Sequence, residues 1–280
     1  QRFNRRWGIE GHRATVIKNA IIPIPTIGKA QNEPVKLIYT SMPWRGLDVL
    51  LDAYELVRRD DILLDVYSSL KIYGSEYERQ ALPHWHPLFD RAASMPGVTY
   101  KGYAPNDEIR EALQRAHMWV YPSTFEETSC LAAIEAGAAA CRMITTNLGA
   151  LPETCAEYAT YVSYGGDRQQ LVERFADAIR YCVNSHHDPG VNYMLKDQIT
   201  YFNEFYSWER RKAQWHDAPV GFAAGRSRPG RRQPRGRWRR TRYAATPTWV
   251  RPAAARAPGT RASRGPQRQA RCSRSWCFLS

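Results

Sequence analysis

The sequence predicts an α/β fold in which a Rossmann-like, doubly wound parallel sheet is followed by a disordered basic tail. Short apolar segments alternate with amphipathic helical segments over about 150 residues from Lys36 onward, and this alternation is typical of a parallel sheet. The short segments are mostly apolar, as expected of strands covered by helices on both faces. After Asp217 the composition changes to mainly Arg, Ala, Pro and Gly, with too few apolar groups to offset the entropy of ordering.

The predicted strands and helices follow one another in a regular order. After the first strand, apolar residues from Leu47 to Val57 fall on one helical face. Pro105 and Asn106 begin a helix striped by Ile109 and Leu113, and two more helices are expected over 129–140 and 171–182. The expected strands are 36–40, 63–67, 97–101, 118–121, 142–146 and 160–163. Because ligands bind outside the carboxyl ends of parallel strands, the loops after these strands are the candidate sites.

The segments on either side of the predicted sheet differ from it in composition. Residues 1–35 are basic and interrupted by prolines, which indicates a lead-in. Residues 201–216 are amphipathic, and Ser207 is a plausible N-cap for a closing helix. We therefore divide the chain into a lead-in (1–35), a ligand-binding domain (36–185), C-terminal helices (186–217) and a tail (218–280).

The net charge of +13 invites a nucleic-acid interpretation, so its position in the chain matters. Residues 218–280 hold sixteen Arg, no Lys and no acidic residue, which leaves 24 basic and 27 acidic residues in 1–217. The predicted folded part is thus slightly acidic. We expect no specific nucleic acid as a partner, although RNA or membrane binding through the tail stays open as an alternative. We interpret the sudden onset of the tail as a sign of a frameshifted end.

The cysteines and the hydropathy indicate a soluble protein. Cys130, Cys141, Cys155 and Cys182 are isolated in apolar surroundings without metal-ligand spacing, which favours buried thiols. No apolar run approaches the roughly 18 residues that span a bilayer, and no secretory signal opens the chain. We therefore expect a cytoplasmic protein, with a peripheral position at the inner membrane face as an open alternative.

Two acidic residues in the stretch 121–135 are the main candidates for chemistry. Glu127 and Glu135 are separated by seven residues, with Glu127 carried by a short loop and a helix expected to start at Thr128 or Ser129. This spacing places the two carboxylates about two helical turns apart, facing one elongated ligand. The amide groups at the start of the helix suit a phosphate. The plainer interpretation is a first-turn acid and a solvated glutamate.

Four segments, taken together, resemble the retaining glycosyltransferases of family 4, which have the GT-B fold, and their bacterial branch in particular. The Glu127-to-Glu135 pair matches the Glu-x7-Glu motif of that family. Residues 39–51 resemble its first strand, basic-Gly turn and helix, and residues 98–103 its third strand and loop. Leu148 to Glu153 resembles its Gly-x-x-Pro-Glu loop, and 205–209 resembles its closing helix. The resemblance covers residues 10–216 and implies the C-terminal, nucleotide-sugar-binding half of a GT-B enzyme.

The resemblance also implies roles for single residues. Glu127 would be catalytic, beside the reacting carbon of the sugar, and Glu135 would hold the ribose hydroxyls. Arg45, with Gly46, would neutralise the diphosphate. The remaining donor-binding residues would be Gly102 and Tyr103 near the base, and the amides of Thr128, Ser129 and Cys130 at the phosphates. The implied reaction is hexose transfer from a nucleotide diphosphate sugar with retention, without metal or other cofactor, to a polysaccharide or membrane-surface acceptor.

The sequence departs from the family in three places. Thr40 or Ser41 stands where many members carry a second basic residue, so half of the diphosphate clamp is absent. Ala140 replaces the glycine that ends the motif helix, which predicts a strained turn. The N-terminal, acceptor-binding domain is missing from residues 1–280, so we expect the chain alone to be inactive or nearly so. A non-catalytic sugar-nucleotide-binding module or pseudoenzyme is therefore an alternative. The pairs His84/His86 and His186/His187 lack a third ligand and are interpreted as surface histidines.

Overall fold

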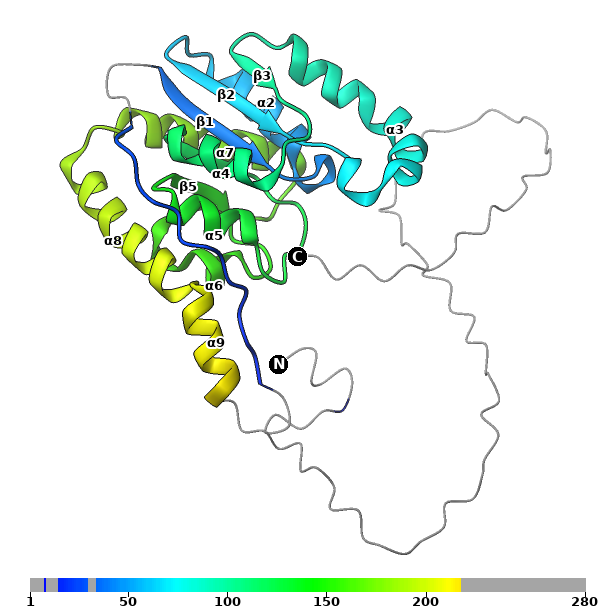
Figure 1. Cartoon of the computed structure of the whole chain (residues 1–280). Coiled ribbons are helices and arrows are strands. Elements are labelled where there is room, and N and C mark those ends of the chain that lie inside the picture. The colour runs from blue at the N-terminus through cyan, green and yellow to red at the C-terminus, as the bar shows by residue number, and fades with distance from the viewer. Residues whose placement is uncertain (1–7, 9–14, 30–33, 218–280) are drawn as a thin grey trace, which may run out of the picture. The chain divides into compact units, whose positions relative to one another are not determined.

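The computed structural model describes Gly8, residues 15–29 and residues 34–217 of the chain (Figure 1). Its six strands form one parallel sheet in the order β3-β2-β1-β4-β5-β6. They are β1 (Val35–Thr40), β2 (Ile62–Tyr67), β3 (Val98–Tyr100), β4 (Met118–Tyr121), β5 (Arg142–Thr146) and β6 (Ala159–Val162). This topology confirms the predicted doubly wound sheet. The tail 218–280, predicted to be disordered, and most of the lead-in before residue 15 lie outside the described residues.

Helices cover both faces of the sheet. On one face α2 packs against α7, and Arg91 of α3 forms an ion pair with Asp52 of α2. On the other face α5 packs against α4, α6 and α8 (Figure 1). The helices are α2 (Leu47–Val57), α3 (Ser75–Ser94), α4 (Asn106–Arg115), α5 (Leu131–Ala138), α6 (Leu151–Cys155), α7 (Arg168–Asn184), α8 (Pro189–Phe205) and α9 (Trp208–Asp217). Short 3-10 helices are η2 (Pro43–Arg45), η3 (Lys71–Tyr73) and η4 (Ala156–Tyr158).

The core lies between the sheet and its two helical layers. Every residue of β4 is fully buried, and the rings of Tyr39 on β1 and Tyr121 on β4 lie 5.9 Å apart. The indole of Trp119, also on β4, donates to the Thr40 hydroxyl at 3.1 Å. The four cysteines Cys130, Cys141, Cys155 and Cys182 are free and buried, as predicted. The contacts of Tyr39, Tyr121 and Trp119 hold β1 and β4 together, and the strand order of the sheet reverses between these two strands.

Several helices differ from the sequence prediction. The prediction missed α3, which contains Pro83 and Pro87 and buries only Phe89 and Ala92. C-terminal helices were expected over 186–217, and α8 and α9 lie there. The helix expected over 129–140 is shorter, because the chain stays extended until Cys130 and α5 begins at Leu131. The predicted cap of the closing helix is confirmed, since the Ser207 hydroxyl accepts from the Arg210 amide at 3.2 Å.

The turn after α5 has the conformation that its sequence predicts to be strained. Ala140 takes a φ of 60°, in the left-handed region. Its carbonyl accepts a hydrogen bond at 2.9 Å from the Nζ of Lys29. An L-residue with a side chain is disfavoured there, and a glycine would adopt the same backbone without that cost.

The segment 15–29 lies along α8 and α9. The Ile21 amide donates to the Tyr206 carbonyl at 2.8 Å, and the Arg211 guanidinium donates to the Asn19 carbonyl at 3.2 Å. Arg211 is only 1% exposed. The segment that precedes the sheet is therefore bound to the helices that follow it.

Candidate functional site

The sheet reverses its strand order between β1 and β4, and the loops after these two strands meet. Gly46, which follows η2, has a φ of 104°, and a Cβ atom there would lie 2.1 Å from the Pro122 carbonyl oxygen. Only glycine allows this approach. Ligands of open α/β sheets bind where the strand order reverses, so these loops define the candidate site.

An ion pair joins the two loops. The Nη1 of Arg45 lies 2.7 Å from the Oε1 of Glu127, and their side chains are 15% and 2% exposed. The Tyr121 hydroxyl donates to the same carboxylate oxygen. The Arg45 guanidinium also lies over the Phe125 ring, 4.7 Å from its centroid. The structure thus brings together two of the residues that the sequence singled out.

The protonation states of Arg45 and Tyr121 are well defined. Burial lowers the pKa of Arg45, but the Glu127 carboxylate and Tyr121 outweigh burial, so that the pKa is raised. Burial also raises the pKa of Tyr121. Arg45 therefore stays cationic and Tyr121 stays a neutral donor at physiological pH.

A third loop holds the backbone of Glu127. The Ala150 amide donates to the Glu127 carbonyl at 2.8 Å. Gly149 has a φ of 61°, and a Cβ atom there would lie 2.7 Å from the Glu127 nitrogen. The loop matched to the Gly-x-x-Pro-Glu segment thus fixes the position of Glu127 by backbone contacts.

A cavity of about 150 Å³ lies at the carboxyl ends of β1, β2 and β3. Gly102 and Tyr103 line it together with Ser41 and Ser68. The Ser41 hydroxyl donates to the Tyr121 hydroxyl at 3.4 Å, and Tyr121 in turn donates to Glu127. A chain of polar contacts therefore connects the cavity with the ion pair.

Glu135 lies on α5 and faces the start of α4. Asn106, three residues after Tyr103, donates to its Oε1 at 3.1 Å. The side chain is buried, and burial raises the pKa of its carboxyl although Asn106 and Arg110 act against this. Glu135 is therefore neither solvated nor paired with Glu127, and it lies beside the loop that lines the cavity.

The residues Thr128, Ser129 and Cys130 form the end of the loop and not the first turn of a helix. Cys130 is the N-cap of α5 and makes no side-chain cap bond. The Ser129 hydroxyl accepts from the Asn19 amide group at 3.1 Å. Burial raises the pKa of the Cys130 thiol well above its ordinary range. The expected helix start is corrected by two to three residues, because the extended loop carries Glu127 back to Arg45.

Sequence reasoning missed three neighbours of the site. Tyr121 was predicted only as a strand residue, and Asn106 only as a helix start. Lys71, whose Nζ lies 4.8 Å from the Tyr103 ring centroid, was not singled out. A signal existed for Tyr121, which ends the strand directly before the loop of Glu127.

The histidines form no metal centre within the described residues, which hold no group of three or more His, Cys, Asp or Glu placed to bind an ion. His117 is buried, and its Nδ1 accepts from the Lys36 amide at 2.9 Å. His186 is half-buried against it, with ring centroids 4.9 Å apart. The expectation of a surface position was wrong for His186, because α7 ends over the amino end of β4.

None of the described helices is both long and apolar enough to cross a bilayer.

Comparison with known proteins gives the family. The family described as Glycosyl transferases group 1 matches residues 33–185, which is more than half of the chain. The chain belongs to this family. None of the curated proteins matches it in sequence.

Solved structures share the fold. A sucrose-phosphate synthase from Thermosynechococcus elongatus is similar, with a TM-score of 0.58, 19% identity, and coverage of 77% of this chain and 54% of that one. A glycosyltransferase from Rickettsia africae has a TM-score of 0.53, 14% identity and coverages of 77% and 49%. Anabaena HepE in complex with UDP-glucose has a TM-score of 0.51, 15% identity and coverages of 65% and 47%. The described domain is therefore of the GT-B glycosyltransferase type, and the chain spans about half the length of these structures.

Proposed function

We propose that this chain is the donor-binding half of a retaining glycosyltransferase, which moves a hexose from a nucleotide diphosphate sugar to an acceptor. One observation carries the proposal. Arg45 and Glu127 are joined at the point where the strand order reverses, beside a cavity at the ends of the neighbouring strands. Membership of the glycosyl transferase family supports the same reaction class.

The donor would extend from the cavity to the ion pair. The base would lie against Gly102 and Tyr103 in the cavity, and the ribose hydroxyls would bond to Glu135. The buried carboxyl of Glu135 lies beside that loop through Asn106, which supports this arrangement. The diphosphate would then reach Arg45, with the loop amides of Thr128, Ser129 and Cys130 at its side. The sugar would lie by Glu127.

Arg45 would stabilise the leaving group. Breaking the bond between sugar and diphosphate leaves negative charge on the phosphate, and a fixed cation lowers the free energy of that transition state. The pKa of Arg45 is raised, so the charge is permanent. Arg45 contacts Glu127 through Nη1, so the diphosphate would share the guanidinium with Glu127. We propose that this charge replaces a metal ion.

A donor-binding module without transferase activity is the second candidate. The basic residue that many family members place near Thr40 or Ser41 is absent. The Glu127 side chain is 2% exposed and held by Arg45 and Tyr121. A carboxylate held this way can organise the loop without touching the reacting carbon.

Donor binding is tested by calorimetry on the purified chain with UDP-glucose, GDP-mannose and ADP-glucose, with and without EDTA. We expect one donor to bind, weakly, and EDTA to leave its affinity unchanged. Arg45→Ala should weaken binding about tenfold or more, since a charge-assisted phosphate contact is lost. The matched control is Arg59→Ala, which removes an arginine outside the candidate site that is paired with Asp61 and donates to Asn184. Equal affinities for both variants, or no binding of any donor, would contradict the proposal.

The role of Glu127 separates the two candidates. The chain should hydrolyse its bound donor, transferring the sugar to water and releasing the nucleotide diphosphate, only very slowly, because it spans about half the length of the similar solved structures. Glu127→Gln should abolish this release while it changes donor affinity little, if Glu127 acts at the sugar. Donor binding without any release by the unaltered chain would favour the binding module, and release that Glu127→Gln leaves unchanged would contradict the role of Glu127.

A further inference from the structure

A second cavity system lies beside the donor site and takes no part in the proposed donor binding. One cavity of about 540 Å³ is lined by Trp44, Trp85 and Arg91 among others. Another of about 320 Å³ is lined by Tyr164 and Arg168 among others. Both cavities have Asp48 and Thr124 in their walls, so they adjoin at these residues. We call the two together the Thr124 groove.

The Thr124 groove touches the candidate site. Its residue Trp44 directly precedes Arg45, and the Thr124 hydroxyl donates to the Trp44 carbonyl at 3.4 Å. Thr124 directly precedes Phe125, and the Arg45 guanidinium lies over the Phe125 ring. A ligand in the groove would therefore lie next to the place proposed for the transferred sugar.

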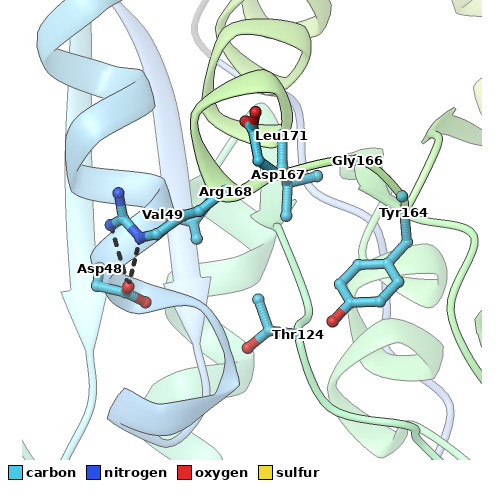
Figure 2. Close-up of a pocket in the computed structure, with 9 residues that line it drawn as sticks. Asp48, Val49, Thr124, Tyr164, Gly166, Asp167, Arg168 and Leu171 are labelled. Carbon is cyan, nitrogen blue, oxygen red and sulfur yellow. Dashed lines mark hydrogen bonds and ion pairs between the residues drawn. The ribbon is translucent and has the colours of Figure 1, made fainter. Parts of the chain in front are cut away.

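Aromatic rings stand at both ends of the groove. At one end the indoles of Trp44 and Trp85 lie 5.8 Å apart at an angle of 48°, with the ring of Tyr73 next to Trp44. At the other end Tyr164 is 43% exposed, and Figure 2 shows its hydroxyl end directed toward Thr124. Partly exposed aromatic rings with a polar partner at hand suit a ligand that is apolar on one side and polar on the other.

The charges that line the groove are balanced, and Asp48 is paired with Arg168. Arg168 donates to Asp48 at 3.0 Å (Figure 2) and lies 2.6 Å from Asp52. Arg91 pairs with Asp52 from the other side. The charged residues that line the groove, apart from His84, are Asp48, Asp167, Arg91 and Arg168. Two carboxylates and two guanidinium groups give no net charge, which disfavours nucleic acid, phosphate and anionic lipid as ligands.

A neutral sugar chain fits these features. The apolar faces of pyranose rings stack on aromatic side chains, and their hydroxyls bond to paired carboxylates and guanidinium groups. From the juxtaposition of Trp44, Trp85 and Tyr164 with the Asp48–Arg168 pair, we infer that the Thr124 groove binds a neutral oligosaccharide. Resting on the proposed function, the groove would hold the part of a neutral glycan acceptor that extends from the acceptor-binding half onto this domain.

The inference is tested by calorimetry on the whole 280-residue chain with maltohexaose, cellohexaose and mannohexaose. We expect at least one of the three to bind with a Kd of about 1 mM or tighter. Trp85→Ala and Tyr164→Ala should each weaken that binding about tenfold, the effect of one aromatic contact. Trp215→Ala and Tyr193→Ala are matched controls, because these rings are 66% and 71% exposed and lie outside the groove.

Parallel titrations with UDP-glucose, GDP-mannose and ADP-glucose separate this inference from the proposed function. All four variants should bind the donor that the unaltered chain binds, with the same affinity. Failure of the unaltered chain to bind any donor would count against the proposed function alone. Failure of all three hexasaccharides to bind at about 10 mM, or equal losses in groove and control variants, would overturn the inference. Trp85 packs partly on the core, so the exposed Tyr164 keeps the test valid if Trp85→Ala lowers stability.

Discussion

Arg45 and Glu127, 82 residues apart in the chain, form an ion pair of 2.7 Å in which the carboxylate is almost completely buried. The pair joins the loops after β1 and β4, so it stabilises the fold as well as shaping the site. Removing one member leaves a buried charge without its partner, and this is costly.

The first prediction concerns this pair. Arg45→Met should lower the free energy of unfolding by about 3 kcal/mol, and Arg45→Met with Glu127→Gln should recover most of the loss. The amide oxygen of Gln can still accept the Tyr121 hydroxyl. Urea unfolding measures both. Arg59→Met, which breaks an exposed pair with Asp61, should cost less than about 1 kcal/mol, and a similar cost for Arg45→Met would contradict the prediction.

The second prediction concerns the contact between Gly46 and Pro122. Gly46→Ala should destabilise the chain by on the order of 4 kcal/mol, because the new methyl would meet the Pro122 carbonyl and φ is positive. Gly74→Ala has a positive φ but open space, and should cost about 2 kcal/mol. Gly28 has neither a positive φ nor a close neighbour, so Gly28→Ala should not change the free energy of unfolding measurably. The order of the three midpoints in urea is the result to check.

The third prediction uses the turn after α5. Ala140→Gly should raise the free energy of unfolding by about 1 kcal/mol, because it removes the left-handed strain at φ 60°. Ala139→Gly, at an ordinary φ of −85°, should lower it by about 0.5 to 1 kcal/mol. Thermal unfolding distinguishes the two by the sign of the change in Tm. A lower Tm for Ala140→Gly would show that the turn carries no strain.

The fourth prediction is a pH dependence. Burial, then His117 and His187, lower the pKa of His186 from 6.5 to about 4 in the folded chain. Between these two pH values His186 is protonated in the unfolded chain and mostly neutral in the folded chain. The free energy of unfolding should therefore fall as the pH drops from about 6.5 to about 4. Allowing for solvent screening of a half-buried ring, the loss should be about 1 to 2 kcal/mol.

His186→Phe should flatten that part of the pH profile, whereas His216→Phe, at an exposed position on α9, should leave it unchanged. Urea unfolding at a series of pH values gives the comparison. An identical slope in His186→Phe and the unaltered chain would assign the pH dependence to other groups.

The central sheet was predictable from the sequence because its strands are short, apolar and separated by clear helical patterns. The long helix α3 was not, since it buries only Phe89 and Ala92 and contains two prolines. Helices were expected over 186–217, but the bounds of α8 could not be predicted, because it buries only Gln198 and Phe202.

The candidate site was predictable as a group of residues but not in its contacts. The sequence placed Glu127 in the loop before a helix and Glu135 on that helix, but it did not give their contacts with Arg45 and Asn106. Such pairings depend on the sheet order, which joins strands distant in sequence. The sequence contains Gly46 and Gly149, but it does not show that their Cα atoms lie against the backbone of Pro122 and Glu127, which is why glycine is required there.

The contacts of Asn19, Ile21 and Ile24 with α8 and α9 connect residues nearly two hundred positions apart. The amide protons of Ile21 and Ile24 are thus protected by acceptors at the other end of the described domain. Opening of α8 or α9 must release the segment 15–29 as well, so the two should exchange with deuterium as one cooperative unit. A force that pulls on residues before β1 would accordingly be borne first by the last two helices and only afterwards by the sheet.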